Sequence, residues 1–261
     1  MMTSVQREPV VAHRWERMWM LAKIEFKLRY YENKLGLLWA LIKPASQILM
    51  YYLVFQVILG QRVPNYAIYL WSGLLVWQFF TESSTGMIKI LQTKKYLYTH
   101  TNMNKLEIYL SHMMSISISL VINIGIFVIG SLISGIYPSY HYIFFVPVFI
   151  NLFLLSLGVA LLLSSLFLLF KDISQVWGII VGFLFFLSPI LYRGKLFEEK
   201  MPILNYANPM AGIIDNARAV MLYEQQPDWA MIGFDFVYAS LIMLLGLWML
   251  KRLGPRASEL L

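Results

Sequence analysis

Six long apolar segments constrain the fold of this 261-residue chain more than any other feature. A helix needs about 20 mainly apolar residues to cross a bilayer. Segments of this kind occupy residues 37–60, 66–85, 108–134, 143–170, 176–192 and 231–250. They are continuously apolar, without the alternation typical of barrel strands, and lipid offers no partners for free backbone groups. We therefore expect an all-α membrane protein with six transmembrane helices, of which the fifth is short.

The composition supports a membrane protein and excludes several other classes. Hydrophobic residues make up 59% of the chain and charged residues 13%, whereas soluble domains have about 45–50% and about 25%. The chain has no Cys, which excludes disulfides and thiol chemistry. Residues 1–34 carry charges throughout, so we expect no cleaved signal peptide.

The net charge of +7 predicts an orientation rather than a nucleic-acid surface. With six spans, 15 of the 21 Lys and Arg residues fall on the side of the N-terminus, the second and fourth loops and the C-terminal tail. Positive residues concentrate on the cytoplasmic side of membrane proteins. Both termini are therefore expected in the cytoplasm, and nucleic acid is not an expected partner.

Two further helices are expected outside the spans. Residues 14–35 fit an interface helix on the cytoplasmic membrane surface, with one apolar face formed by Trp15, Met18, Trp19, Ala22 and Phe26. A second arc, of Leu21, Ile24 and Leu28, could rest on the bundle. Pro209 to Leu222 is apolar at helical spacing but too short to span, which predicts a re-entrant or interfacial helix between spans five and six.

Motifs for chemistry within the chain are absent. There is no P-loop, no nucleophile motif and no spacing of the four histidines that suits a metal, so neither a metal nor another cofactor is expected here. Three charged residues fall within predicted spans. Glu82 and Asp235 are near enough to span ends to be solvated, and Lys43 either lies at the inner mouth of a pathway or snorkels to the interface. The many aromatic residues of the spans fit interfacial belts, or a channel lining that suits sugar rings.

Several strings coincide in order and spacing with a known family. They are GLLWALIKP at 36–44, PNY at 64–66, SGLLVWQFF at 72–80, FKDI at 170–173, SPILY at 188–192 and NP at 208–209 with Arg218 following. From about Trp19 to the C-terminus the chain resembles the ABC-2 transport permeases. Among them it is most similar to the polysaccharide and polyol phosphate exporters that move O-antigens, capsules and wall teichoic acid.

The resemblance implies a single ABC-2 transmembrane domain over residues 1–261, which is a permease subunit and not an enzyme. Two copies would form a channel in the bacterial cytoplasmic (inner) membrane. Two copies of a separate cytoplasmic ATPase, which would hold ATP and Mg, would drive it. The expected substrate is a glycan linked to undecaprenyl diphosphate, with O-antigen favoured and wall teichoic acid or capsule as alternatives.

The resemblance and the residue types together predict four groups of site residues. We expect an aromatic channel lining, a cationic contact with the lipid diphosphate, a loop that couples to the ATPase and a gate helix. The groups are, in that order, Tyr51, Tyr52, Phe55 and Trp77; Lys23, Lys27, Arg29 and Lys34; Lys94, Lys95, Tyr96 and Tyr98; and Asp215 and Arg218.

Two functions from other classes remain as alternatives. An intramembrane enzyme acting on lipid-linked sugars would need an acidic or His cluster at one membrane face, and Glu198 with Glu199 is the only paired acid on the outer side. An ion channel would conduct without any ATPase.

Overall fold

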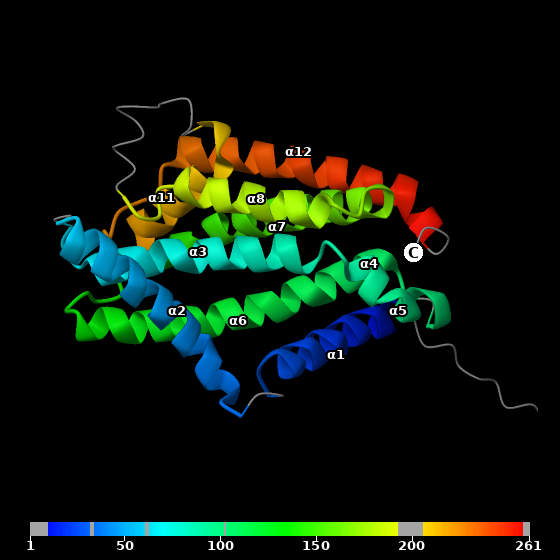
Figure 1. Ribbon diagram of the computed structural model, residues 1–261, viewed down its shortest axis with the longest axis horizontal. Coiled ribbons are helices and arrows are strands. Elements are labelled where there is room, and N and C mark those ends of the chain that lie inside the picture. The colour runs from blue at the N-terminus through cyan, green and yellow to red at the C-terminus, as the bar shows by residue number, and fades with distance from the viewer. Residues whose placement is uncertain (1–9, 32–33, 61–62, 102, 193–205, 258–261) are drawn as a thin grey trace, which may run out of the picture.

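The computed structural model describes residues 10–31, 34–60, 63–101, 103–192 and 206–257, and within these ranges every regular element is a helix (Figure 1). The helices are α1 (Val10–Tyr31), η1 (Gly36–Leu38), α2 (Trp39–Tyr51), the π-helix η2 (Tyr52–Ile58), α3 (Tyr66–Gly86), α4 (Ile90–Thr93), α5 (Lys95–His100), α6 (Lys105–Ile133), η3 (Tyr140–Phe144), α7 (Phe145–Leu169), α8 (Ile173–Phe186), α11 (Pro209–Met221), α12 (Trp229–Leu253) and η4 (Gly254–Arg256).

Four helical segments are long and apolar enough to cross a membrane: Gly36–Ile58, Lys105–Ile133, Tyr140–Leu169 and Trp229–Leu253. The two other expected spans are also helical, as α3 with 21 residues and α8 with 14. At 1.5 Å per residue α8 is about 21 Å long, so the prediction that this segment is short is confirmed. It ends just before Pro189, which lacks an N–H and disfavours a helical conformation in the residue before it.

Helix α3 forms the centre of the bundle. It packs against α6, α7, α8 and α11, and most of its residues are buried. A helix that is buried on nearly all sides needs apolar or small residues all round, which its sequence YAIYLWSGLLVWQFF supplies.

Helices α7 and α12 pack along each other at very short range because each contributes a glycine. A Cβ atom on Gly158 of α7 would lie 2.7 Å from the backbone nitrogen of Met243, and one on Gly246 of α12 would lie 2.8 Å from the carbonyl oxygen of Gly158. Small residues at a helix interface let two backbones approach closely in a membrane.

Helix α1 lies beside the first half of α6, at the end of the bundle that carries α4 and α5 (Figure 1). Among residues 14–31, the buried residues of this helix are Ala22, Glu25 and Tyr30. The expectation that a second apolar arc rests on the bundle is wrong for Ile24 and Leu28, which are 47% and 51% exposed. The small side chain of Ala22 allows the close approach instead, and Glu25 meets polar partners.

Candidate functional site

A buried carboxylate ties α1 to the loop that follows α3. Glu25 is 9% exposed and accepts hydrogen bonds from Lys94 Nζ at 2.6 Å and from His112 Nδ1 at 2.7 Å. Burial alone would raise the pKa of Glu25, but the hydrogen bonds and charges of His112 and Lys94 outweigh burial and lower it below the ordinary value. Lys94 stands between α4 and α5, and His112 belongs to α6. Glu25 therefore links α1, the α4–α5 segment and α6.

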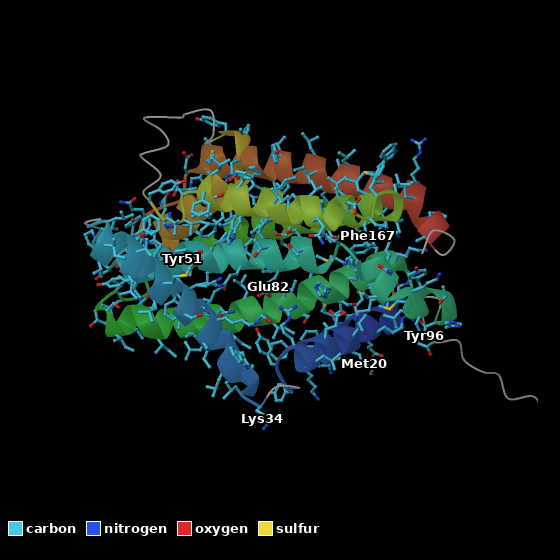
Figure 2. All side chains as sticks on the ribbon, in the orientation of Figure 1. Met20, Lys34, Tyr51, Glu82, Tyr96 and Phe167 are labelled. Carbon is cyan, nitrogen blue, oxygen red and sulfur yellow. The ribbon has the colours of Figure 1, made fainter. Side chains whose placement is uncertain are left out.

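The four predicted coupling residues play different structural parts. Lys94 is held by Glu25, and Tyr98 donates its hydroxyl to the Leu91 carbonyl at 3.0 Å. Tyr96 is 67% exposed and lies at the end of the bundle beyond α1 (Figure 2). Lys95 is half-buried. Lys94 and Tyr98 therefore hold the α4–α5 segment in place, whereas the ring of Tyr96 is exposed on its surface.

A polar pocket of about 500 Å³ lies between α1, α2, α3 and α6. Its charged lining residues are Arg29 of α1, Lys43 of α2 and Glu82 of α3. Arg29 Nη1 forms a 2.6 Å ion pair with Glu82 Oε2. Within the described residues, no ion pair involves Lys43. Lys43 and Glu82 are 39 positions apart in the sequence, yet they line one pocket.

Uncharged amides and aromatic rings complete the pocket. Gln78 Nε2 donates to Gln47 Oε1 at 2.7 Å. Asn123 Nδ2 donates to the Ser119 carbonyl at 3.0 Å, while its buried Oδ1 has no partner in the part of the chain that the structure describes. The rings are those of Tyr30 and Trp39. Sequence reasoning missed the three amides because it weighed only charged residues, although amides within apolar spans are themselves a signal.

The four cationic residues that were expected to contact the lipid diphosphate do not lie together. Arg29 alone among them lines the pocket. Lys23, Lys27 and Lys34 are exposed, and Lys34 lies where the chain turns from α1 toward α2 (Figure 2). Lys23 Nζ is 5.9 Å from the ring centroid of Trp19 on its own helix.

The expected aromatic lining falls into two clusters. Tyr51 stacks on Phe185 of α8 at 5.5 Å between ring centroids, and Trp77 meets the same ring edge-on at 5.6 Å. Tyr52 instead faces Tyr66 at 6.5 Å. Phe55 is half-buried against the core. Phe185 was absent from the predicted set, yet it joins α2, α3 and α8.

Arg218 belongs to the helix predicted over residues 209–222, and its side chain lies inside the bundle, 1% exposed. It donates to the carbonyls of Pro189 and, at 2.9 Å, Ile190, and its guanidinium lies 3.7 Å from the ring centroid of Tyr69. Asp215, one turn earlier, is 3.6 Å away and 39% exposed in its side chain. Arg218 thus fastens α11 to the turn after α8 and to α3.

Helix α11 begins where the sequence predicted, at Pro209. The Asn208 side chain accepts from the backbone of Met210 at 3.1 Å, and Pro209 occupies the first turn, where its missing N–H costs nothing. The same Asn208 side chain donates to the Leu187 carbonyl at 3.1 Å. The start of α11 is therefore also attached to the end of α8.

Asp235 departs from expectation, since it is only 1% exposed and not solvated at a span end. Within the described ranges its two carboxylate oxygens have no hydrogen-bond partner, and no group of three or more His, Asp and Glu side chains could hold a metal ion. Glu198 and Glu199 lie outside the described residues.

Comparison of the sequence with known proteins finds a family and several relatives. Residues 16–222 match the ABC-2 type transporter family. The chain is 24% identical over 259 residues, 99% of its length and 100% of the relative's, to an O-antigen export system permease protein RfbA of Klebsiella pneumoniae. A protein of the same name from Myxococcus xanthus is 23% identical, covering 80% of this chain and 81% of the relative. A polysialic acid transport protein KpsM of Escherichia coli is 19% identical, covering 86% of each chain. Because the family match extends over most of the sequence, the chain belongs to the ABC-2 type transporter family.

Proposed function

We propose that this chain is the permease subunit of an ABC transporter that exports a lipid-linked polysaccharide, O-antigen, across the cytoplasmic membrane. The observation that carries the proposal is the alignment with an O-antigen export permease over 99% of this chain and all of the relative. A match that covers both chains end to end argues for the same type of subunit rather than one shared segment.

The proposed assembly contains two copies of this chain and two copies of a cytoplasmic ATPase. The sequence has no P-loop, so ATP and Mg would be held by the ATPase. The six apolar helical segments would cross the inner membrane with both termini in the cytoplasm, because most Lys and Arg residues then face the cytoplasm. The α4–α5 segment would dock on the ATPase, and the exposed ring of Tyr96 supports this assignment.

The route through the membrane would follow the aromatic residues. Tyr51 and Trp77 meet at Phe185, where α2, α3 and α8 join, and flat rings can pass sugar faces without holding them tightly. Helix α11, with Asp215 and Arg218, would be a re-entrant gate helix. Its attachment to the turn after α8 supports this role, since movement of α8 would pull on it.

The proposal is tested in a bacterium whose own O-antigen permease gene is deleted. This chain and its cognate ATPase are expressed together, and O-antigen on surface lipopolysaccharide is measured by immunoblot. Export is expected to return with an active ATPase and to stay absent with an ATPase whose P-loop lysine is replaced. If the complex assembles in the membrane and undecaprenyl-linked O-antigen still accumulates inside the cell, the proposed substrate is wrong.

A capsular polysaccharide is the second candidate substrate, because the KpsM relatives are named as polysialic acid transport proteins. The same experiment in a strain that lacks its capsule permease distinguishes the two. Restored capsule without restored O-antigen would favour the capsule.

A further inference from the structure

We propose that the polar pocket between α1, α2, α3 and α6 binds the phosphate and first sugar of a lipid-linked glycan before export. This inference rests on the proposed function and adds to it a defined site on the chain. The pocket includes residues of three helices that belong to the apolar segments, yet three charged side chains and three amides are among its lining. Polar and ionisable residues are costly at such positions, and they usually face a cavity with a function.

The charges of the pocket suit a phosphate. Arg29 and Lys43 provide two cations against the single carboxylate of Glu82, which leaves an excess of one positive charge. The Arg29 guanidinium is already oriented by Glu82 at 2.6 Å, and Lys43 has no ion-pair partner among the described residues. A phosphate that enters would meet a free ammonium and a positioned guanidinium, the two groups that bind phosphates best in proteins.

The uncharged part of the pocket suits a sugar. Gln47 and Gln78 use one amide atom each in their mutual hydrogen bond. A primary amide has two N–H donors and an acceptor oxygen, so both side chains keep hydrogen-bonding capacity for sugar hydroxyls. The ring of Trp39 in the lining offers an apolar surface for a sugar face.

The size and place of the pocket agree with this ligand. A volume of about 500 Å³ lies within the roughly 300–1,000 Å³ typical of small-ligand pockets. It also lies where α1, with its exposed apolar residues Trp19, Ile24 and Leu28, meets α2. A lipid tail could remain in the bilayer beside α1 while the head group occupies the pocket.

A phosphate head group could also come from an ordinary phospholipid, and a binding experiment separates the two sources. The permease–ATPase complex in phosphatidylcholine nanodiscs is titrated with undecaprenyl diphosphate carrying one N-acetylglucosamine, or with phosphatidylglycerol. Binding is measured by calorimetry. We expect the sugar-bearing lipid to bind in preference to phosphatidylglycerol. Lys43→Gln is expected to weaken its binding roughly tenfold or more, because a hydrogen bond to a charged group is lost.

Two further variants keep the outcome clear. Gln78→Ala removes an amide and leaves the charge, so it should weaken binding of the sugar-bearing lipid but not of undecaprenyl diphosphate alone. Lys251→Gln removes an exposed cation at the far end of α12 and should leave binding unchanged. All variants are first shown to elute with the ATPase as the wild type does.

The proposal would be overturned if phosphatidylglycerol bound as tightly as the sugar-bearing lipid and with the same dependence on Lys43. The pocket would then be a binding site for ordinary phospholipids. Unchanged binding in both Lys43→Gln and Gln78→Ala would also overturn it. The wild-type chain could fail to export O-antigen in cells while Lys43→Gln and Gln78→Ala still weaken binding of the sugar-bearing lipid. In that case the pocket stands and the proposed function falls. If O-antigen is exported by the wild type and by both variants, and neither variant changes binding of the sugar-bearing lipid, the proposed function stands and the pocket falls.

Discussion

Replacing Gly158 by Ala should destabilise the bundle although Ala is the better helix former. The added Cβ would lie 2.7 Å from the backbone nitrogen and 2.9 Å from the Cα atom of Met243. Ordinary carbon contacts are about 3.5–4.0 Å. Because the contacted atoms are backbone, no side-chain rotation relieves the clash, and α12 must move away from α7 by several tenths of an ångström or more.

The expected decrease in the free energy of unfolding follows from two opposing effects, helix propensity and overpacking. The substitution gains roughly 0.8–1 kcal/mol from helix propensity, and overpacking a tight contact typically costs about 1–3 kcal/mol. The interface between α7 and α12 also loses van der Waals contacts along its length as the helices separate. We expect a net decrease of about 1–2 kcal/mol in the free energy of unfolding.

Gly233→Ala is the matched control, because Gly233 lies on α12 with nothing within 4 Å of an added Cβ. It should leave the free energy of unfolding unchanged or raise it by up to about 1 kcal/mol. Unfolding is measured by titrating SDS into the folded protein in mixed micelles. A Gly158→Ala variant as stable as the wild type, or an equal loss in Gly233→Ala, would refute the claim that backbone contact sets this interface.

Three further predictions concern the residues that fasten helices together. Glu25→Gln should increase hydrogen exchange in α1 and lower stability by about 2–3 kcal/mol, since two charge-assisted hydrogen bonds are weakened. The pKa of Glu25 is lowered in the folded state, so its contribution to stability is full above about pH 4.5 and declines as the pH falls through the folded pKa. The free energies of unfolding of the wild type and the variant should therefore converge in acid. A difference that stays constant with pH would contradict this. Arg218→Lys should loosen the turn after α8, because a lysine cannot bond two carbonyls and stack on Tyr69 at once, and exchange of the amides of residues 187–192 reports it. Gly73→Ala should resemble Arg218→Lys in that assay, since its Cβ would lie 2.6 Å from Arg218 Nη2, whereas normal exchange in Gly73→Ala would show that the arginine can shift.

Hydropathy predicted the helices well because a bilayer leaves the backbone few alternatives. Helix α11 begins at the predicted Pro209, where Asn208 and Pro209 form a standard helix start. The faces of the helices were harder to predict. In α1 the second apolar arc was expected to rest on the bundle, yet Ile24 and Leu28 are about half exposed and Glu25 is buried. Lipid tolerates exposed apolar side chains, so apolar character alone does not tell packing from lipid contact.

The candidate pocket could not be assembled from the sequence for a related reason. Considered alone, Glu82 was expected near a span end, and Lys43 at the inner mouth of a pathway or snorkelling to the interface. Their common position is visible only once α2 and α3 are placed side by side with α6, because Gln47, Gln78 and Asn123 then complete the same lining. The sequence placed Arg218 on the correct helix but did not predict its burial, since an arginine is expected in the interior only once its carbonyl partners are known.

Two of the ion pairs formed by α1 connect the coupling segment to the pocket. Glu25 binds Lys94, next to α5, and Arg29 binds Glu82 in the pocket lining. The two residues are four positions apart, so they lie on the same face of α1, one turn from each other. Both pairs include a side chain that is at most a quarter exposed, so screening by water is limited on at least one side of each. One turn of helix is too stiff to absorb a displacement between two neighbouring residues of the same face. A shift of α5 that pulls on Lys94 must therefore either break the ion pair between Lys94 and Glu25 or move Arg29 relative to Glu82. Helix α1 is therefore one mechanical connection, within the described residues, between the proposed ATPase contact and the proposed head-group site.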